Sequence, residues 1–191
     1  IPLTHLKKLV LTGEKVSAEL VNRFYGLYQI PLVNAYGQSE CSDDTLHYQI
    51  PYDTKTRQVP IGHPALNTQV YILDKLQQLL PLNCIGELYI SGDGVSPGYL
   101  HNQNLTKEKF MVNPFSSGTK MYQTGDLAKW DADGMVLFCG RTDHQVKIRG
   151  NRVEISEIEA TLKQIKGVNE VAVVAKTNKE QLYLCAYLAI D

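Results

Sequence analysis

A run of seven residues, Asn34-Ala35-Tyr36-Gly37-Gln38-Ser39-Glu40, brings together an amide, a phenol, a glycine, a hydroxyl and a carboxylate. These groups suit a phosphorylated ligand, because an aromatic ring can stack on a base, glycine lets the backbone come close and a hydroxyl can donate to a phosphate oxygen. Glu40 could hold Mg²⁺, which prefers oxygen ligands and shares them with phosphates. The alternative is a polar loop that closes the preceding strand, and spacing alone favours that alternative.

A second candidate is Asp126, in the run Tyr122-Gln-Thr-Gly-Asp126-Leu. A tight Thr-Gly turn between two expected strands would place this carboxylate where both of its oxygens can accept from neighbouring hydroxyls. A ribose offers such a pair of hydroxyls. An Asx turn that caps its own backbone explains the same residues, and the motif alone favours the Asx turn.

The segment from Gly140 to Glu159 carries four cations and four acids in twenty residues. A solvated charged hairpin explains this composition. It is explained equally by a phosphate-facing Arg141 followed by a pivot at Asp143, because a hinge needs only a few conformationally tolerant residues.

The glycines between Gly86 and Leu100 have some likeness to a dinucleotide-binding fingerprint. That interpretation fails on context, because no helix is expected to open at Gly98, Pro97 interrupts the run, and the acid expected about 20 residues later is missing. We therefore interpret these glycines as turns between strands.

The elements that position these residues change in character along the chain. A buried strand at Lys8–Thr12 precedes a helix capped by Ser17, and a short strand follows at Ile30–Val33. From residue 58 to 140 short β runs alternate with turn residues, including an Asp133-Gly134 hairpin signal, with one short helix near Leu105–Phe110. The β runs lie at residues 69–73, 87–91, 120–123, 127–130 and 135–138.

After residue 141 the pattern becomes α+β. A strand at residues 146–149 precedes a helix that we expect to begin with the capping box Ser156-x-x-Glu159 and to end at Gly167. Residues 168–175 and 182–189 then predict two antiparallel strands. We place a boundary near residues 142–144.

Composition excludes several classes of function. The 191 residues have a formal net charge of −1, which disfavours nucleic acid and anionic membrane surfaces as partners. No apolar stretch approaches the roughly 18 residues of a membrane span, and no signal peptide is apparent, so we expect a cytoplasmic protein. The scattered cysteines and histidines predict no metal site of their own.

Taken together, four motifs resemble those of adenylate-forming enzymes, and most closely the adenylation domains of nonribosomal peptide synthetases. They read N-A-Y-G-Q-S-E from Asn34, G-E-L-Y-I-S-G-D-G-V-S-P-G-Y-L from Gly86, Y-Q-T-G-D-L from Tyr122 and G-R-T-D-H-Q-V-K-I-R-G from Gly140. The resemblance covers nearly the whole chain. It implies an α/β, β-rich fold with residues 1–142 as the C-terminal portion of the adenylation core subdomain and 143–191 as an incomplete small C-terminal subdomain.

The resemblance also implies a role for each matched residue. Asn34 and Tyr36 would contact adenine, with Gly13 and Glu14 on the other side of the ring and Gly37 allowing close approach. Ser39 would contact the α-phosphate, and Glu40 would bind Mg²⁺. Asp126 would bind both ribose hydroxyls, with Arg141 beside the ribose and phosphate. Asp143 would be the hinge, and Lys147 would lie on the pantetheine path, with Glu40, Arg141 and Lys147 as the catalytic residues.

The remaining positions concern the substrate and two departures from the family pattern. The resemblance places the amino-acid pocket at Val10, Thr12, Ala35, Asp43 and Asp44, where the paired acids favour a cationic or polar side chain or else face solvent. Where the family usually reads Y-G-P-T-E, this chain has Gln38 in place of the proline and Ser39 in place of the threonine. Phe138 stands where a tyrosine near the ribose is usual, so a hydrogen bond would be lost.

The implied function is ATP-dependent activation of an amino acid and its loading onto the phosphopantetheine of a peptidyl carrier protein, beside a condensation domain. The 191 residues contain neither a Lys-containing phosphate loop nor the late catalytic lysine of the family, so we expect a piece of a larger ligase that is inactive alone. The alternatives are an acyl- or aryl-CoA ligase, or a non-catalytic segment that docks a carrier protein.

Overall fold

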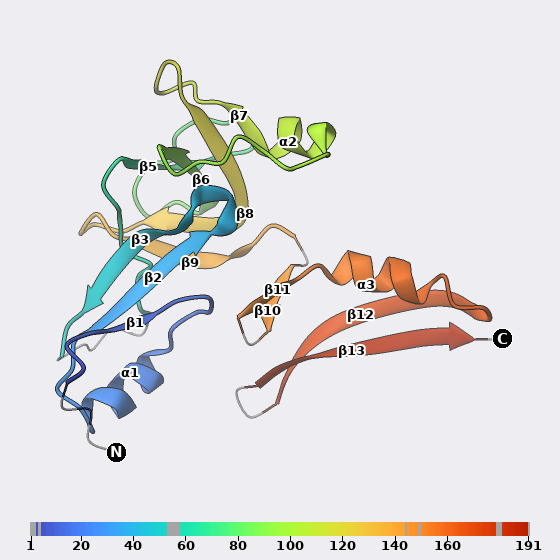
Figure 1. The fold of residues 1–191 in the computed structure, drawn as a ribbon, viewed down its shortest axis with the longest axis horizontal. Coiled ribbons are helices and arrows are strands. Elements are labelled where there is room, and N and C mark those ends of the chain that lie inside the picture. Colours follow the sequence, from blue (N-terminus) through green and yellow to red (C-terminus); the bar gives the residue numbers. More distant parts are fainter. Residues whose placement is uncertain are drawn as a thin grey trace. The chain divides into compact units, whose positions relative to one another are not determined.

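The structure is a computed structural model that describes residues 3, 5–52, 58–143, 145–148, 150–178 and 181–190, with only the backbone of Gln181. His144 and Arg149, which lie in the charged segment after Gly140, fall outside the described residues. The chain divides into two compact units, Ile1–Thr142 and Asp143–Asp191, and each is described by itself (Figure 1).

The first unit begins with a sheet of strand order β1-β2-β3-β4. β1 and β2 are parallel, and the other neighbours are antiparallel. Between β1 and β2 lies α1, whose first turn is capped by Ser17: its Oγ accepts from the backbone N of Leu20 at 3.1 Å, as predicted. The bounds are β1 Leu9–Leu11, α1 Ala18–Tyr25, β2 Leu32–Gln38, β3 Asp43–Ile50 and β4 His63–Pro64.

A second sheet of the same unit has the order β5-β6-β8-β7, and β9 pairs with β8. The long strand β8 is therefore hydrogen-bonded to β6, β7 and β9 along its length. The predicted hairpin at Asp133-Gly134 is confirmed as the turn between β8 and β9. The bounds are β5 Thr68–Leu73, β6 Gly86–Gly92, α2 Gln103–Lys109, β7 Phe110–Val112, β8 Lys120–Trp130 and β9 Val136–Arg141.

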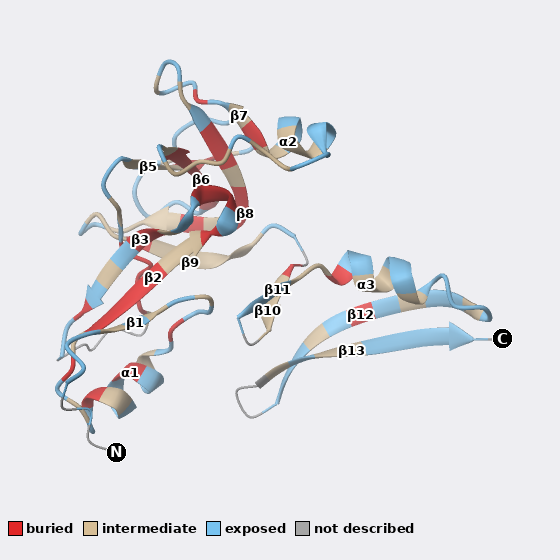
Figure 2. Ribbon diagram, viewed as in Figure 1, coloured by how far each residue is buried: buried red, intermediate tan, exposed pale blue. Residues whose placement is uncertain are grey.

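A common core joins the two sheets of the first unit. Leu46 of β3 packs in one cluster with Ile72, Leu88 and Tyr122 of the second sheet. Figure 2 shows the buried residues concentrated on β2, β6 and β8. β2 and β8, which carry Tyr36, Gln38 and Asp126, are thus among the most deeply packed strands, which fixes their positions.

The second unit contains a short hairpin, a helix and a long hairpin. β12 and β13 pair antiparallel over their whole length, which confirms the two predicted strands. The bounds are β10 Val146–Ile148, β11 Asn151–Val153, α3 Ile155–Leu162, β12 Val168–Asn178 and β13 Gln181–Ile190.

Three local predictions are wrong. Residues 34–38 are not a loop but the second half of β2, followed by the 3-10 turn η1 (Ser39–Cys41). Asp126 does not lie at a turn between two strands, because β8 runs without interruption through it. Gly125 has φ +74°, and the strand absorbs this with register shifts against both neighbours instead of ending.

The capping box is also absent. Ser156 lies inside α3, the helix is preceded by Glu154 without a side-chain cap, and it ends at Leu162, before Gly167. Glu159 Oε1 instead accepts from the backbone N of Val173 at 2.7 Å, which ties the helix to β12. The mixed, sheet-rich fold class is confirmed, and among the described residues no helix is long and apolar enough to span a membrane.

Candidate functional site

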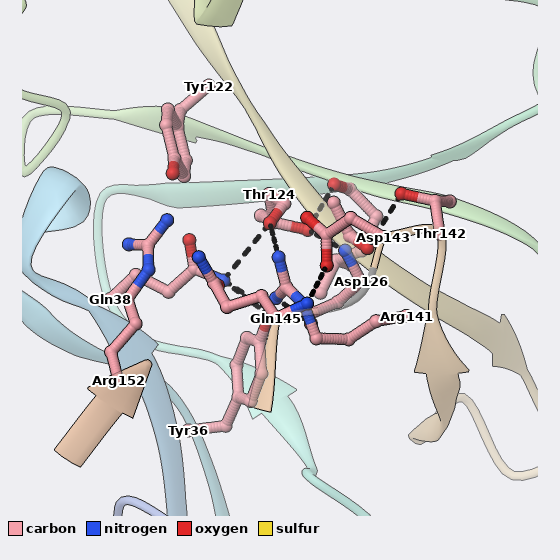
Figure 3. Close-up of polar contacts among 12 residues, drawn as sticks. Tyr36, Gln38, Tyr122, Thr124, Asp126, Arg141, Thr142, Asp143, Gln145 and Arg152 are labelled. Atoms are coloured by element: carbon pink, nitrogen blue, oxygen red, sulfur yellow. Dashed lines mark hydrogen bonds and ion pairs between the residues drawn. The ribbon is translucent and has the colours of Figure 1, made fainter. Parts of the chain in front are cut away.

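The candidate site of the first unit is centred on the Asp126 carboxylate. Asp126 is 4% exposed on β8 and is the direct cross-strand partner of Arg141 on β9. The side chains of Tyr36 and Gln38, both from β2, converge on the same carboxylate (Figure 3). Because alternate residues of a strand point to one face, a single strand delivers both side chains.

Both oxygens of the carboxylate are engaged. Oδ2 accepts from the Tyr36 hydroxyl and from Gln38 Nε2, the latter at 2.8 Å. Arg141 Nη1 forms an ion pair and hydrogen bond with Oδ1. Burial, followed by the Asp126 charge, holds the pKa of Tyr36 well above its usual range, so the phenol is a hydrogen-bond donor at neutral pH.

The backbone around Asp126 is held by Thr124 and Thr142. Thr124 Oγ1 accepts from the backbone N of Asp126 at 3.0 Å and donates to the carbonyl of Leu88 at 2.7 Å. The carbonyl of Gly125 accepts from the backbone N and the Oγ1 of Thr142, at 2.9 and 3.0 Å. These bonds fix the carboxylate on the β8–β9 pair, a rigid support of the kind that a binding site needs.

A second carboxylate lies one turn beyond β2. Glu40 is in η1 and is only 9% exposed, and its Oε1 accepts from the Tyr99 hydroxyl at 2.9 Å. Among the described residues no group of three or more His, Cys, Asp or Glu could hold a metal ion. A lone oriented carboxylate still fits Mg²⁺, because that ion is commonly held by one or two carboxylates together with substrate phosphates.

The other residues predicted to contact the nucleotide do not join the cluster around Asp126. Asn34 is buried, and its amide donates to the carbonyl of Pro60 at 2.6 Å, so this side chain braces the sheet. Phe138 packs against the main core, while Ser39 is exposed at the start of η1. Gly13 has φ +88° just beyond β1, and the adjacent Glu14 is exposed.

The five predicted pocket residues are only partly brought together. Thr12 Oγ1 donates to Asp44 Oδ1 at 2.7 Å, which joins the end of β1 to the start of β3. Ala35 is buried in β2, the strand that lies between β1 and β3 in the sheet, whereas Val10 and Asp43 are exposed.

The second unit holds the other two assigned residues. Asp143 Oδ1 accepts from the backbone N of Gln145 at 3.1 Å at the entry to this unit. Lys147 is half-buried on β10, opposite Arg152 of β11. Two cations at one cross-strand position favour an anionic neighbour.

The sequence analysis did not predict the contacts that three side chains of the site make. Gln38 was interpreted only as a departure from proline, Tyr99 only as part of a glycine-rich turn, and Thr124 only as a turn residue. Their partners lie 88, 59 and 36 residues away along the chain, a separation that no local pattern encodes.

Comparison with known proteins identifies the family. The family described as AMP-binding enzyme matches residues 2–100, more than half of the chain. The chain belongs to the AMP-binding enzyme family. The resemblance inferred from the motifs is thereby confirmed.

Among relatives, bacitracin synthase 3 of Bacillus licheniformis is 47% identical over 97% of this chain. Gramicidin S synthase 2 of Brevibacillus brevis is 46% identical over 98% of it. The chain spans only 3% and 4% of these two proteins, respectively.

Solved structures of this family give the same result for the fold. PA1221, a nonribosomal peptide synthetase protein containing adenylation and PCP domains, superposes with a TM-score of 0.89 at 27% identity, over 99% of this chain and 39% of that chain. The Vibrio cholerae adenylation domain AlmE, solved in complex with glycyl-adenosine-5'-phosphate, superposes with a TM-score of 0.85 at 26% identity, over 95% of this chain and 35% of that chain. The fold of AMP-binding adenylation domains is therefore shared.

Proposed function

We propose that the chain is part of an adenylation domain that activates an amino acid with ATP and loads it onto a peptidyl carrier protein in nonribosomal peptide synthesis. Residues 1–142 would be the C-terminal portion of the core subdomain, and 143–191 the beginning of the small C-terminal subdomain. The observation that carries the proposal is the convergence of Tyr36, Gln38 and Arg141 on the buried carboxylate of Asp126. Family membership and the carrier domains of its structural relatives support the rest.

The nucleotide would be held by its ribose and its base. Asp126 would offer its oxygens to the 2'- and 3'-hydroxyls, and the Arg141 guanidinium lies against this carboxylate as a positive charge. The ring of Tyr36 lies beside the same carboxylate and would pack on adenine, with Asn34, Gly37 and Phe138 shaping the base side.

The chemistry would take place at the α-phosphate. An oxygen of the amino-acid carboxylate attacks the α-phosphorus, the bond to pyrophosphate breaks, and aminoacyl-AMP forms. Ser39 would donate to the α-phosphate, and Glu40, oriented by Tyr99, would hold Mg²⁺ together with the phosphates. The ion supplies neutralisation of phosphate charge, while the protein supplies position.

Transfer follows when the carrier thiol attacks the acyl carbon and AMP leaves. Asp143 would be the pivot between the two reactions, and Lys147 would line the path of the phosphopantetheine arm. A condensation domain would use the loaded amino acid. Because ATP is the co-substrate, we place this reaction in the cytoplasm.

The amino acid would be selected at the edge formed by Val10, Thr12, Ala35, Asp43 and Asp44. Thr12 already engages Asp44, which presents a polar, acidic wall. We expect a cationic or strongly polar side chain to be accepted, because Asp43 and Asp44 bring two acidic side chains to this edge and attract a group of opposite charge.

Amino-acid-dependent exchange of pyrophosphate into ATP tests this proposal. The assay compares these 191 residues with a complete adenylation domain that contains them, across Arg, Lys, Tyr, Leu and a fatty acid. We expect exchange from the complete domain alone, with Arg or Lys most active. Exchange with the fatty acid only would favour a CoA ligase, and no exchange with any acid would favour a carrier-docking role.

A further inference from the structure

Two histidines face each other across a pair of strands in the first unit. His47 of β3 and His63 of β4 are direct cross-strand partners in the antiparallel register, and both are exposed. Residues directly opposite each other in such a pair have their side chains on the same face of the sheet, with Cβ atoms about 4.5–5.5 Å apart. The two imidazole rings therefore project from neighbouring points of one exposed face.

The backbone beneath the pair is held closely. The backbone N of Ala65, just after β4, donates to the carbonyl of Thr45 at 2.8 Å, and the carbonyl of Gly62 accepts from the backbone N of Val136 at 3.0 Å. Gly62 has φ +100°, and a Cβ there would lie 2.0 Å from the carbonyl oxygen of His47. Only glycine therefore allows β4 to approach β3 this closely. The two rings are carried by a fixed backbone, as a binding site requires.

Neither ring is engaged within the part of the protein that the structure describes. No hydrogen bond or ion pair there involves the side chain of His47 or His63. Imidazole is the commonest protein ligand of transition metals and suits Zn²⁺, Cu²⁺ and Ni²⁺. Two imidazoles that reach one ion bind it more tightly than either does alone, because the second contact forms at a high effective concentration.

We propose that His47 and His63 form a two-histidine site for a divalent transition-metal ion such as Zn²⁺, with water completing the coordination. The described residues contain no group of three or more His, Cys, Asp or Glu that could hold a metal, so the protein supplies two ligands. The site differs from that proposed for Mg²⁺ at Glu40, because Mg²⁺ takes oxygen ligands. The inference does not rest on the proposed function.

The pair continues the edge that we propose for the amino acid. His47 also lies opposite Ala35 of β2, so Ala35, His47 and His63 form one row on one face of the sheet. The sequence analysis expected no metal site from the histidines, because these two are far apart along the chain and only the strand register pairs them. Since a bound ion would lie beside the proposed amino-acid edge, its binding is best measured without amino acid or ATP.

Calorimetric titration of the intact protein with Zn²⁺, prepared without a histidine tag and in an excess of Mg²⁺, tests the site. We expect one Zn²⁺ per chain at the tightest site. His47→Asn and His63→Asn should each raise its dissociation constant by at least about tenfold, because either change removes the chelation. The double variant should be little weaker than either single variant, because the two contacts are coupled.

His101→Asn is the matched control, because His101 is exposed and lies outside the strands. We expect it to bind Zn²⁺ as the unaltered protein does. Zn²⁺ should also raise the melting temperature of the unaltered protein and of His101→Asn, but not of the double variant, since an ion that binds only the folded state stabilises it. Absent Zn²⁺ binding, an equal weakening in His101→Asn, or effects of the two single variants that simply add would overturn the site.

Discussion

Asp126 is the residue on which the proposed nucleotide site depends most. We expect Asp126→Asn to raise the dissociation constant of AMP by about 10- to 100-fold, because the variant loses the charge-assisted acceptors and leaves Arg141 without its ion pair. Calorimetry with AMP on the intact protein measures this change. Asp133→Asn, in the exposed turn before β9, is the control. Equal weakening in both variants would contradict the assignment.

Cys41 gives the site region a dependence on alkaline pH. Burial, followed by the charge of Glu40, raises the pKa of this thiol from 9.0 to about 12. The folded state therefore keeps a proton that the unfolded state loses, so the stabilisation is complete below about pH 9 and is lost as the pH rises towards 12.

The expected slope can be measured by urea unfolding at pH 8, 9 and 10. Above pH 9 we predict that the free energy of unfolding of the first unit falls by about 1 kcal/mol per pH unit from this thiol. Cys41→Ala should reduce the slope, whereas Cys84→Ala, at an exposed thiol, should not. A slope that is insensitive to Cys41→Ala would show that the thiol is not the source.

Tyr99 carries a prediction about the metal. Its hydroxyl donates to Glu40 Oε1, so Tyr99→Phe leaves the ring in place and removes one constraint on that carboxylate. We expect the Mg²⁺ concentration needed for half-maximal pyrophosphate exchange to rise by about three- to tenfold, with little change in AMP affinity without metal. Tyr71→Phe is the control, and an unchanged Mg²⁺ requirement would contradict the role.

At the scale of elements, the sequence predicted strands and helices better than their ends. The Ser17 cap was predictable because a side-chain cap is a local interaction, whereas Glu159, expected in a local capping box, bonds instead to the backbone of β12. β8 was predicted as two strands because Gly125 has the local signature of a turn, and only pairing with β6 and β9 carries the strand through it. β3, rich in polar residues, was missed because its pairing with β2 defines it.

The absence of the capping box at the start of α3 leads to a stability prediction. Glu159→Ala removes the acceptor for the backbone N of Val173, and we expect it to cost the second unit about 1–2 kcal/mol of unfolding free energy. Ser156→Ala, inside the helix, should change it by less than about 0.5 kcal/mol. Urea unfolding of both variants measures the difference, and a larger effect from Ser156→Ala would restore the capping box.

At the scale of the whole molecule, the four motifs were sufficient to predict the family because their order and spacing are jointly specific, and the comparisons confirmed it. The arrangement of side chains within the site was not predictable to the same degree. Asp126 meets Tyr36 and Gln38 only because two sheets of the first unit share one core, and such contacts join residues about 90 positions apart.

The measurement that tests the central claim most directly is a crystal structure of the intact protein with AMP. We predict both ribose hydroxyls within about 2.6–3.0 Å of the Asp126 carboxylate oxygens, with Tyr36 beside the base. AMP bound elsewhere, or ribose hydroxyls held by other residues while Asp126 engages only Tyr36, Gln38 and Arg141, would contradict it.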